Sequence, residues 1–121
     1  MRVLSVRGAV RVDDDTPENV KYWTVETVRE LLEHNGIDSE NIINIIFSQT
    51  TDIRSENPAR ALRSSGGFDH VPLFCTAEPE YPNTLKKMIR ILMTFQTDAQ
   101  IRPKPVYKNG AENLRSDLVF P

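Results

Sequence analysis

Arginines in separate segments are the residues of this sequence best suited to chemistry. Arg7 lies in an apolar segment, whereas Arg60 and Arg63 are three residues apart in a helical segment and therefore share a face. Arg90 and Arg115 follow later in the chain. Guanidinium groups are planar and permanently charged, so several of them together suit a small substrate with more than one carboxylate. Each arginine taken alone could equally be a solvated surface side chain, and only the group indicates a pocket for an anion.

Cys75 and Glu78 are a second set of candidates because they follow a predicted strand, and strand ends often carry site residues in α/β folds. The alternatives are a small buried hydrophobic residue for Cys75 and an exposed loop acid for Glu78. Residue types and spacing alone therefore lead to a small α/β protein with an anion pocket.

Common catalytic motifs are missing from the sequence. It contains no glycine-rich phosphate loop, no Gly-x-Ser-x-Gly and no His-Glu-x-x-His. His34 and His70 stand singly, as surface or capping histidines usually do. Cys75 is the one cysteine, so it can form no internal disulfide and has no second cysteine for a zinc site. We therefore expect an enzyme of this sequence to work without covalent catalysis and without a metal.

Length and composition favour one domain covering residues 1–121. Hydrophobic residues make up 39% and charged residues 26% of the chain, and the formal net charge is -2. This balance argues against a nucleic-acid partner, which usually requires a basic excess. The apolar run at the N-terminus is short and contains Arg2 and Arg7, which is typical of a strand and not of a signal peptide. No segment approaches the roughly 18 apolar residues of a membrane helix, so a cytoplasmic protein is expected.

Three helices are predicted. The first follows Thr16-Pro17, has apolar residues at helical spacing and ends at Asn35-Gly36. The second is short, begins after Asn57 and ends at two glycines. The third covers residues 85–93, where apolar residues again recur at helical spacing.

Four strands are predicted around these helices, in residues 3–12, 42–47, 71–74 and 101–107. Gly8 inside the first strand indicates a bulge or a close backbone approach, and Pro72 places the third strand at a sheet edge or a bulge. The alternation of elements favours an α/β (α+β) fold in which helices pack on one face of a mixed sheet.

Several segments, in a consistent order, resemble the AroH-type chorismate mutases. The first strand carries Arg7 before a glycine, the short helix carries Arg60 and Arg63, and the third strand is followed by Glu78. The likeness covers nearly the whole chain, in residues 6–10, 58–63, 71–78, 85–98 and 106–118. It implies a mixed sheet, a pseudo-barrel homotrimer with sites between subunits, and no cofactor.

The resemblance also assigns roles to residues. Arg90 is implied to contact the ether oxygen and a carboxylate of chorismate, and Arg7 to bind the side-chain carboxylate near Tyr107. Glu78 and Cys75 are implied to meet the ring hydroxyl. The neighbouring subunit or the tail is implied to complete the pocket with Arg60, Arg63, Leu73, Phe74, Leu114 and Arg115.

The implied function is that of an isomerase, which rearranges chorismate to prephenate on the shikimate route to phenylalanine and tyrosine. Two residues differ from the family pattern, so the family's function does not carry over to this sequence without question. Asn57 lies where the family usually has a phenylalanine that packs on the substrate, and Ser116 lies where a proline is common. Other interpretations therefore stay open: a trimeric module that binds a small carboxylic acid without converting it, a small trimeric imine/enamine deaminase, or a structural subunit.

Overall fold

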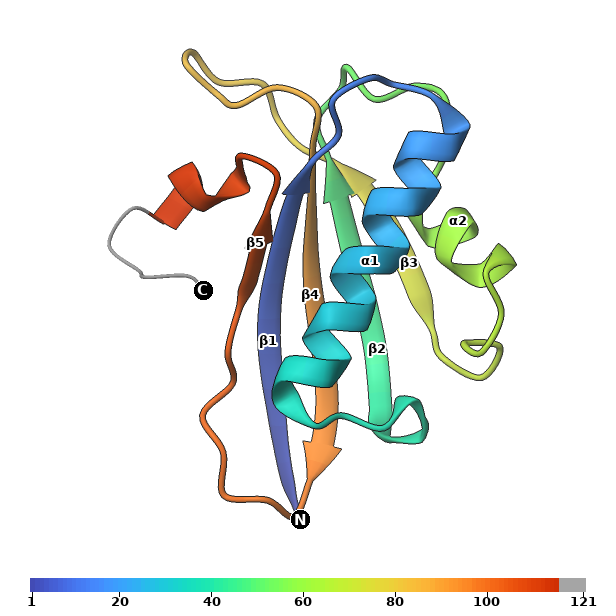
Figure 1. Cartoon of the computed structure of the whole chain (residues 1–121), viewed down its shortest axis with the longest axis vertical. Coiled ribbons are helices and arrows are strands. Elements are labelled where there is room, and N and C mark those ends of the chain that lie inside the picture. The colour runs from blue at the N-terminus through green and yellow to red at the C-terminus, as the bar shows by residue number, and fades with distance from the viewer. Residues whose placement is uncertain (116–121) are drawn as a thin grey trace.

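Five strands form one mixed sheet, and two helices lie on one of its faces in the computed structural model, which describes residues 1–115 (Figure 1). The elements in chain order are β1 (Arg2–Arg11), α1 (Pro17–Asn35), η1 (Ser39–Asn41), β2 (Ile42–Gln49), α2 (Pro58–Ser64), β3 (Leu73–Ala77), β4 (Met88–Thr97), β5 (Val106–Lys108) and η2 (Ala111–Arg115). The strand order across the sheet is β3-β2-β4-β1-β5. The predicted fold class, with helices on one face of a mixed sheet, is confirmed.

The predicted third helix is wrong, because residues 88–97 form the central strand β4. β4 pairs antiparallel with β1 along its whole length, from Met88↔Arg11 to Thr97↔Arg2, and antiparallel with β2 on its other side. The segment is mostly apolar, so it contains helical spacing but also supplies apolar residues to both faces of a buried strand. Two flanking ladders decide between these outcomes, and the sequence of the segment alone does not show them.

Helix α1 approaches β1 closely at Gly8. The helix begins at its cap Thr16, whose Oγ1 accepts a hydrogen bond from the Asn19 N–H at 3.1 Å. A Cβ added to Gly8 would lie 3.0 Å from Leu31 Cδ1 and 3.4 Å from Thr27 Cγ2, both on α1. The close approach predicted at this glycine is therefore confirmed, and the missing side chain lets the helix pack against the sheet.

β3 is an edge strand and begins two residues later than predicted. Pro72 lies just before it, where its carbonyl accepts the Ile45 N–H at 3.0 Å and its missing N–H costs no bond in the ladder. The last strand is shorter than predicted, since β5 starts only after Pro103 and Pro105 and runs parallel to β1.

The two faces of the sheet differ in what covers them. The face under the helices holds most of the core, including Phe47, Ile91 and Phe95. The opposite face, which we call the open face, carries a row formed by Phe74, Ile46 and Leu92, where each is the register partner of the next. Their exposed fractions are 66%, 39% and 39%. The same face carries Val3, which is 62% exposed. Exposed apolar side chains that adjoin one another mark surfaces suited to contact with another protein.

Candidate active site

Arg90 and Glu78 form an ion pair at the open face. Arg90 lies in β4, and Glu78 follows the end of β3, where its backbone N–H donates to the Gln49 carbonyl at 2.8 Å. The Arg90 Nε lies 3.5 Å from Glu78 Oε1, and the two side chains are 35% and 13% exposed. The other carboxylate oxygen, Oε2, accepts a hydrogen bond from the Ser48 hydroxyl at 2.8 Å. The predicted pair of site residues therefore lies together, with a serine that the sequence analysis did not select.

Arg7 lies on the same face, in the strand next to Arg90. In the antiparallel register Arg7 pairs with Leu92 and Arg90 pairs with Ala9, so the two arginines are diagonal neighbours. Diagonal neighbours have Cα atoms about 7–8 Å apart, within the reach of two long side chains. Two guanidinium groups at this spacing repel each other, and a ligand with two carboxylates relieves that repulsion.

Tyr107 is close to this group through β5. It is the register partner of Ala9, which places it on the open face beside the Arg90 row, and it is 5% exposed. It packs in a small apolar cluster with Ala9, Met88 and Ala111. The structure thus brings Arg7, Glu78, Arg90 and Tyr107 to one region, as the resemblance implies.

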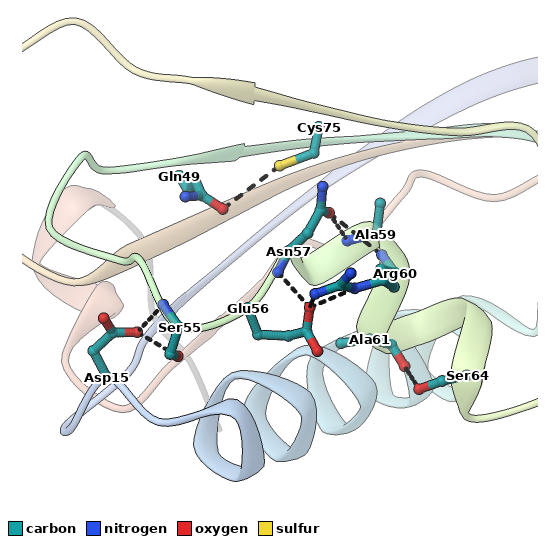
Figure 2. Close-up of polar contacts among 10 residues, drawn as sticks. All are labelled: Asp15, Gln49, Ser55, Glu56, Asn57, Ala59, Arg60, Ala61, Ser64 and Cys75. Atoms are coloured by element: carbon teal, nitrogen blue, oxygen red, sulfur yellow. Dashed lines mark hydrogen bonds and ion pairs between the residues drawn. The ribbon is translucent and has the colours of Figure 1, made fainter.

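Cys75 lies on the other face of the sheet. It is the partner of Phe47 in the β2–β3 register, and it is partly buried against the core. Its Sγ donates to Gln49 Oε1 at 3.6 Å (Figure 2). Gln49 Nε2 in turn donates to the Ile53 carbonyl at 2.9 Å. Burial raises the pKa of the Cys75 thiol, so the protonated form dominates at neutral pH. This environment suits a hydrogen-bond donor and not a nucleophile.

Asn57 caps helix α2. Its Oδ1 accepts hydrogen bonds from the N–H groups of Ala59 at 2.8 Å and Arg60 at 3.3 Å (Figure 2). A phenylalanine at this position could not make either bond. Asn57 and Cys75 also line one pocket of about 330 Å³ at the β3 edge. Asn57 therefore has a local structural role beside the candidate site.

Arg60 and Arg63 do not act as one pair of free cations. Arg60 binds Glu56, with Nε at 2.8 Å and Nη2 at 2.7 Å from the carboxylate oxygen Oε1. The Asn57 N–H, followed by the Arg60 side chain, lowers the pKa of the Glu56 carboxyl. Arg63 instead donates to the carbonyls of Phe68 at 2.6 Å and Val71 at 2.9 Å, which fixes the loop that leads into β3. Arg60 is exposed and Arg63 is partly buried.

The remaining predicted residues fall into two groups. Leu73 packs against the core on the helix face, and Phe74 points to the open face. Leu114 and Arg115 belong to η2, but their side chains lie outside the described part of the structure, as does all of Ser116.

One chain therefore holds two half-sites that do not meet. The first, on the open face, contains Arg7, Glu78 and Arg90; the second, at the β3 edge and α2, contains Cys75 and Arg60. Sequence reasoning missed three residues that orient them: Ser48, Gln49 and Glu56. The first two follow the predicted strand 42–47, so the strand-end argument that selected Glu78 would also have found them.

Residues 1–115 contain neither a cluster of metal-binding side chains nor a helix that could span a membrane. No group of three or more His, Cys, Asp or Glu side chains in that range is arranged to hold a metal ion. None of the helices there has both the length and the apolar character needed to cross a membrane.

The fold and the open-face half-site define a class: a small α+β protein with neighbouring arginines and a sheltered carboxylate on one face of its sheet. The sequence pattern of the family described as chorismate mutase type I matches residues 3–118. Chorismate mutase AroH of Bacillus subtilis is 34% identical, over 98% of this chain and 94% of its own length. Chorismate mutase AroH of Thermus thermophilus is 41% identical, over 96% of each chain. The chain belongs to the chorismate mutase type I family.

A solved structure agrees with this assignment. A chorismate mutase from Clostridium thermocellum superimposes with a TM-score of 0.85 and is 36% identical. The match covers 91% of this chain and 98% of that protein. The likeness therefore extends over sequence, strand order and helix placement together.

Proposed function

We propose that this chain rearranges chorismate to prephenate on the open-face half-site, with Arg90 as its central residue. The observation that carries the proposal is the position of Arg90: a partly buried cation beside a sheltered carboxylate, with a second arginine diagonal to it. The reaction is intramolecular and pericyclic, so it requires neither a nucleophile nor a proton transfer. The protonated Cys75 thiol is compatible with such chemistry.

Electrostatic stabilisation is the first effect that the site supplies. The carbon–oxygen bond breaks ahead of carbon–carbon bond formation, so the ether oxygen gains negative charge. Arg90 is fixed in a central strand, and it can therefore meet this charge without reorganisation. A preorganised donor of this kind contributes roughly 3 kcal/mol to a barrier. The gain appears in the transition state and not in the bound substrate, so it raises kcat.

Selection of the reactive conformer is the second effect. Chorismate must fold so that its two reacting carbons meet, and most of its population in water is not folded. Arg7 and Arg90 together can hold two carboxylates, and Glu78 can accept the ring hydroxyl. A site that holds both ends of chorismate selects the folded conformer, which is rare in solution, as the bound form.

We infer that the complete site forms between subunits of a homotrimer. Two features support this. The row of Phe74, Ile46 and Leu92 is exposed in the single chain, and the two half-sites lie apart. A neighbouring copy that covers the open face would bury the row and bring its own Arg60 and Cys75 toward Arg90. We expect the enzyme to act in the cytoplasm, as one step in making phenylalanine and tyrosine.

The decisive experiment follows the ultraviolet absorbance of chorismate after addition of purified protein. Acid treatment converts prephenate to phenylpyruvate, which identifies the product. Saturable conversion that persists in the presence of a chelator is the expected result. Binding of chorismate in a calorimeter without conversion would instead favour a binding module, the second candidate, which the engagement of Asn57 in helix capping supports. If the protein neither binds nor converts chorismate, both candidate functions are overturned.

A further inference from the structure

We propose that Ser48 is a positioning residue that keeps the Glu78 carboxylate from closing onto Arg90. The inference rests on the proposed function of the Arg90 site and adds a residue to it. Ser48 donates its hydroxyl hydrogen to Glu78 Oε2 at 2.8 Å, while Oε1 lies 3.5 Å from the Arg90 Nε. One oxygen of the carboxylate is thus committed to the serine, and only the other faces the arginine.

The Arg90–Glu78 contact is longer than such a pair normally adopts. A carboxylate and a guanidinium group left to themselves form short, often two-pronged hydrogen bonds of about 2.7–2.9 Å. Here the Arg90 Nε lies 3.5 Å from Glu78 Oε1, and within residues 1–115 the buried Arg90 Nε–H has no hydrogen-bond acceptor. A buried donor without an acceptor is unfavourable, so something must prevent the carboxylate from rotating toward it. The bond from Ser48 is the interaction that does so.

The backbone holds this arrangement from three strands. Ser48 in β2 is the register partner of Arg90 in β4 on one side and of Thr76 in β3 on the other. Glu78 is anchored two residues beyond Thr76 by its N–H bond to the Gln49 carbonyl at 2.8 Å. The side chains of Ser48, Glu78 and Arg90 therefore all start from backbone that hydrogen bonds between strands hold in place. The Ser48 hydroxyl needs only a rotation of its own side chain to reach the carboxylate.

The consequence is a partly exposed guanidinium group on which the carboxylate has not closed. If Glu78 closed onto Arg90, the carboxylate would neutralise the charge that the ether oxygen needs and would occupy the donor. With Ser48 in place, Glu78 stays oriented, and the partly exposed guanidinium group of Arg90 remains ready for an oxygen of the ligand. Ser48 thus acts through Glu78 and Arg90 and does not itself have to touch the substrate.

The test compares Ser48→Thr with Ser48→Val, two variants of nearly equal shape that differ in the hydroxyl. We expect Ser48→Thr to retain most of the activity and Ser48→Val to lose at least about tenfold in kcat, the scale of a lost hydrogen bond to a charged group. Ser48→Ala should resemble Ser48→Val. Ser5→Ala is the matched control, because it removes a serine contact to Thr94 at 3.0 Å on the same face of the sheet. Equal kcat in the Thr and Val variants would overturn the inference.

A double-mutant cycle separates positioning from a general structural effect. In a Glu78→Ala background no carboxylate remains to be held, so Ser48→Val should cause no further loss of kcat. A loss in that background as large as in the wild type would show that Ser48 does not act through Glu78.

A spectroscopic readout makes the inference independent of turnover. The ¹⁵N-labelled Nε–H signal of Arg90, assigned by its disappearance in Arg90→Lys, should shift downfield in Ser48→Val as the carboxylate moves onto it. An unchanged signal would contradict the proposal. If the wild-type protein converts no chorismate, the proposed function fails, and the Arg90 signal still decides the role of Ser48.

Discussion

Asp52 binds the backbone of Lys87 with both carboxylate oxygens, at 3.1 and 3.0 Å from its N–H. Lys87 has a φ of 54°, in the left-handed region that non-glycine residues rarely adopt. The adjacent Met88 N–H donates to Thr50 Oγ1 at 2.9 Å, and Thr50 donates its hydroxyl to Asp52 at 2.5 Å. The turn after β2 therefore fixes the first residues of β4, and so the start of the strand that carries Arg90.

Removal of the Asp52 carboxylate should destabilise the protein. Asp52→Ala removes the acceptor of the Lys87 N–H and of the Thr50 hydroxyl, which in turn binds the buried Met88 N–H. We therefore expect the free energy of unfolding, measured by urea denaturation, to fall by about 1–3 kcal/mol. Asp52→Asn retains one acceptor and should fall between this variant and the wild type. Asp69→Ala, at an exposed loop position, should stay within about 0.5 kcal/mol. Equal stability of Asp52→Ala and Asp69→Ala would contradict the structural role.

Arg90→Ala should abolish most of the activity with the fold preserved. Loss of one preorganised donor reduces kcat by a factor of about 100–1,000. Arg90→Lys keeps the positive charge but loses the planar fork, so it should recover only part of the rate. Steady-state kinetics with circular dichroism as the folding check measures both. Arg29→Ala, which removes an exposed pair with Glu26 on α1, is the control. Near-normal kcat in Arg90→Ala would remove Arg90 from the mechanism.

Asn57→Ala should lower stability through the cap of α2. The substitution removes the acceptor for two helix N–H groups, and a lost cap costs about 1 kcal/mol in the free energy of unfolding. Asn57→Ser keeps an oxygen at the cap and should be close to the wild type. Thermal unfolding of the two variants side by side gives the comparison. If alanine and serine behave alike, the capping oxygen contributes nothing.

Cys75 should react slowly with alkylating reagents at neutral pH. Burial raises the pKa of this thiol, so its reactive thiolate forms only at higher pH than in a free cysteine. The rate of alkylation by iodoacetamide, followed by mass spectrometry, should therefore begin to rise at a higher pH than that of a small free thiol. Cys75→Ser, which leaves no cysteine in the chain, is the control for labelling elsewhere. A rate at pH 7 above that of the free thiol would contradict the buried environment.

Local signals predicted several elements correctly. α1 and α2 were predictable because each has a proline start, a capping side chain and a defined stop within a few residues. β2 was predictable from a short β-branched run. The predicted helix at residues 85–93 was wrong because a mostly apolar segment can match either the helix or the strand period, and only pairing with β1 and β2 selects the strand.

The sequence by itself determined which residue types are present for the site: arginines in separate segments, one acidic residue after a strand, and one cysteine. Tertiary structure decided which of them meet. The predicted helix over residues 85–93 would have carried Arg90, whereas its register in β4 places it opposite Ser48 and diagonal to Arg7. Cys75 and Glu78 are three residues apart, yet the alternation of side chains along β3 and just beyond it places them in different surroundings. The physical reason is that side chains alternate between the two faces of a sheet, so the partner of each residue depends on long-range pairing that spacing along the chain does not contain.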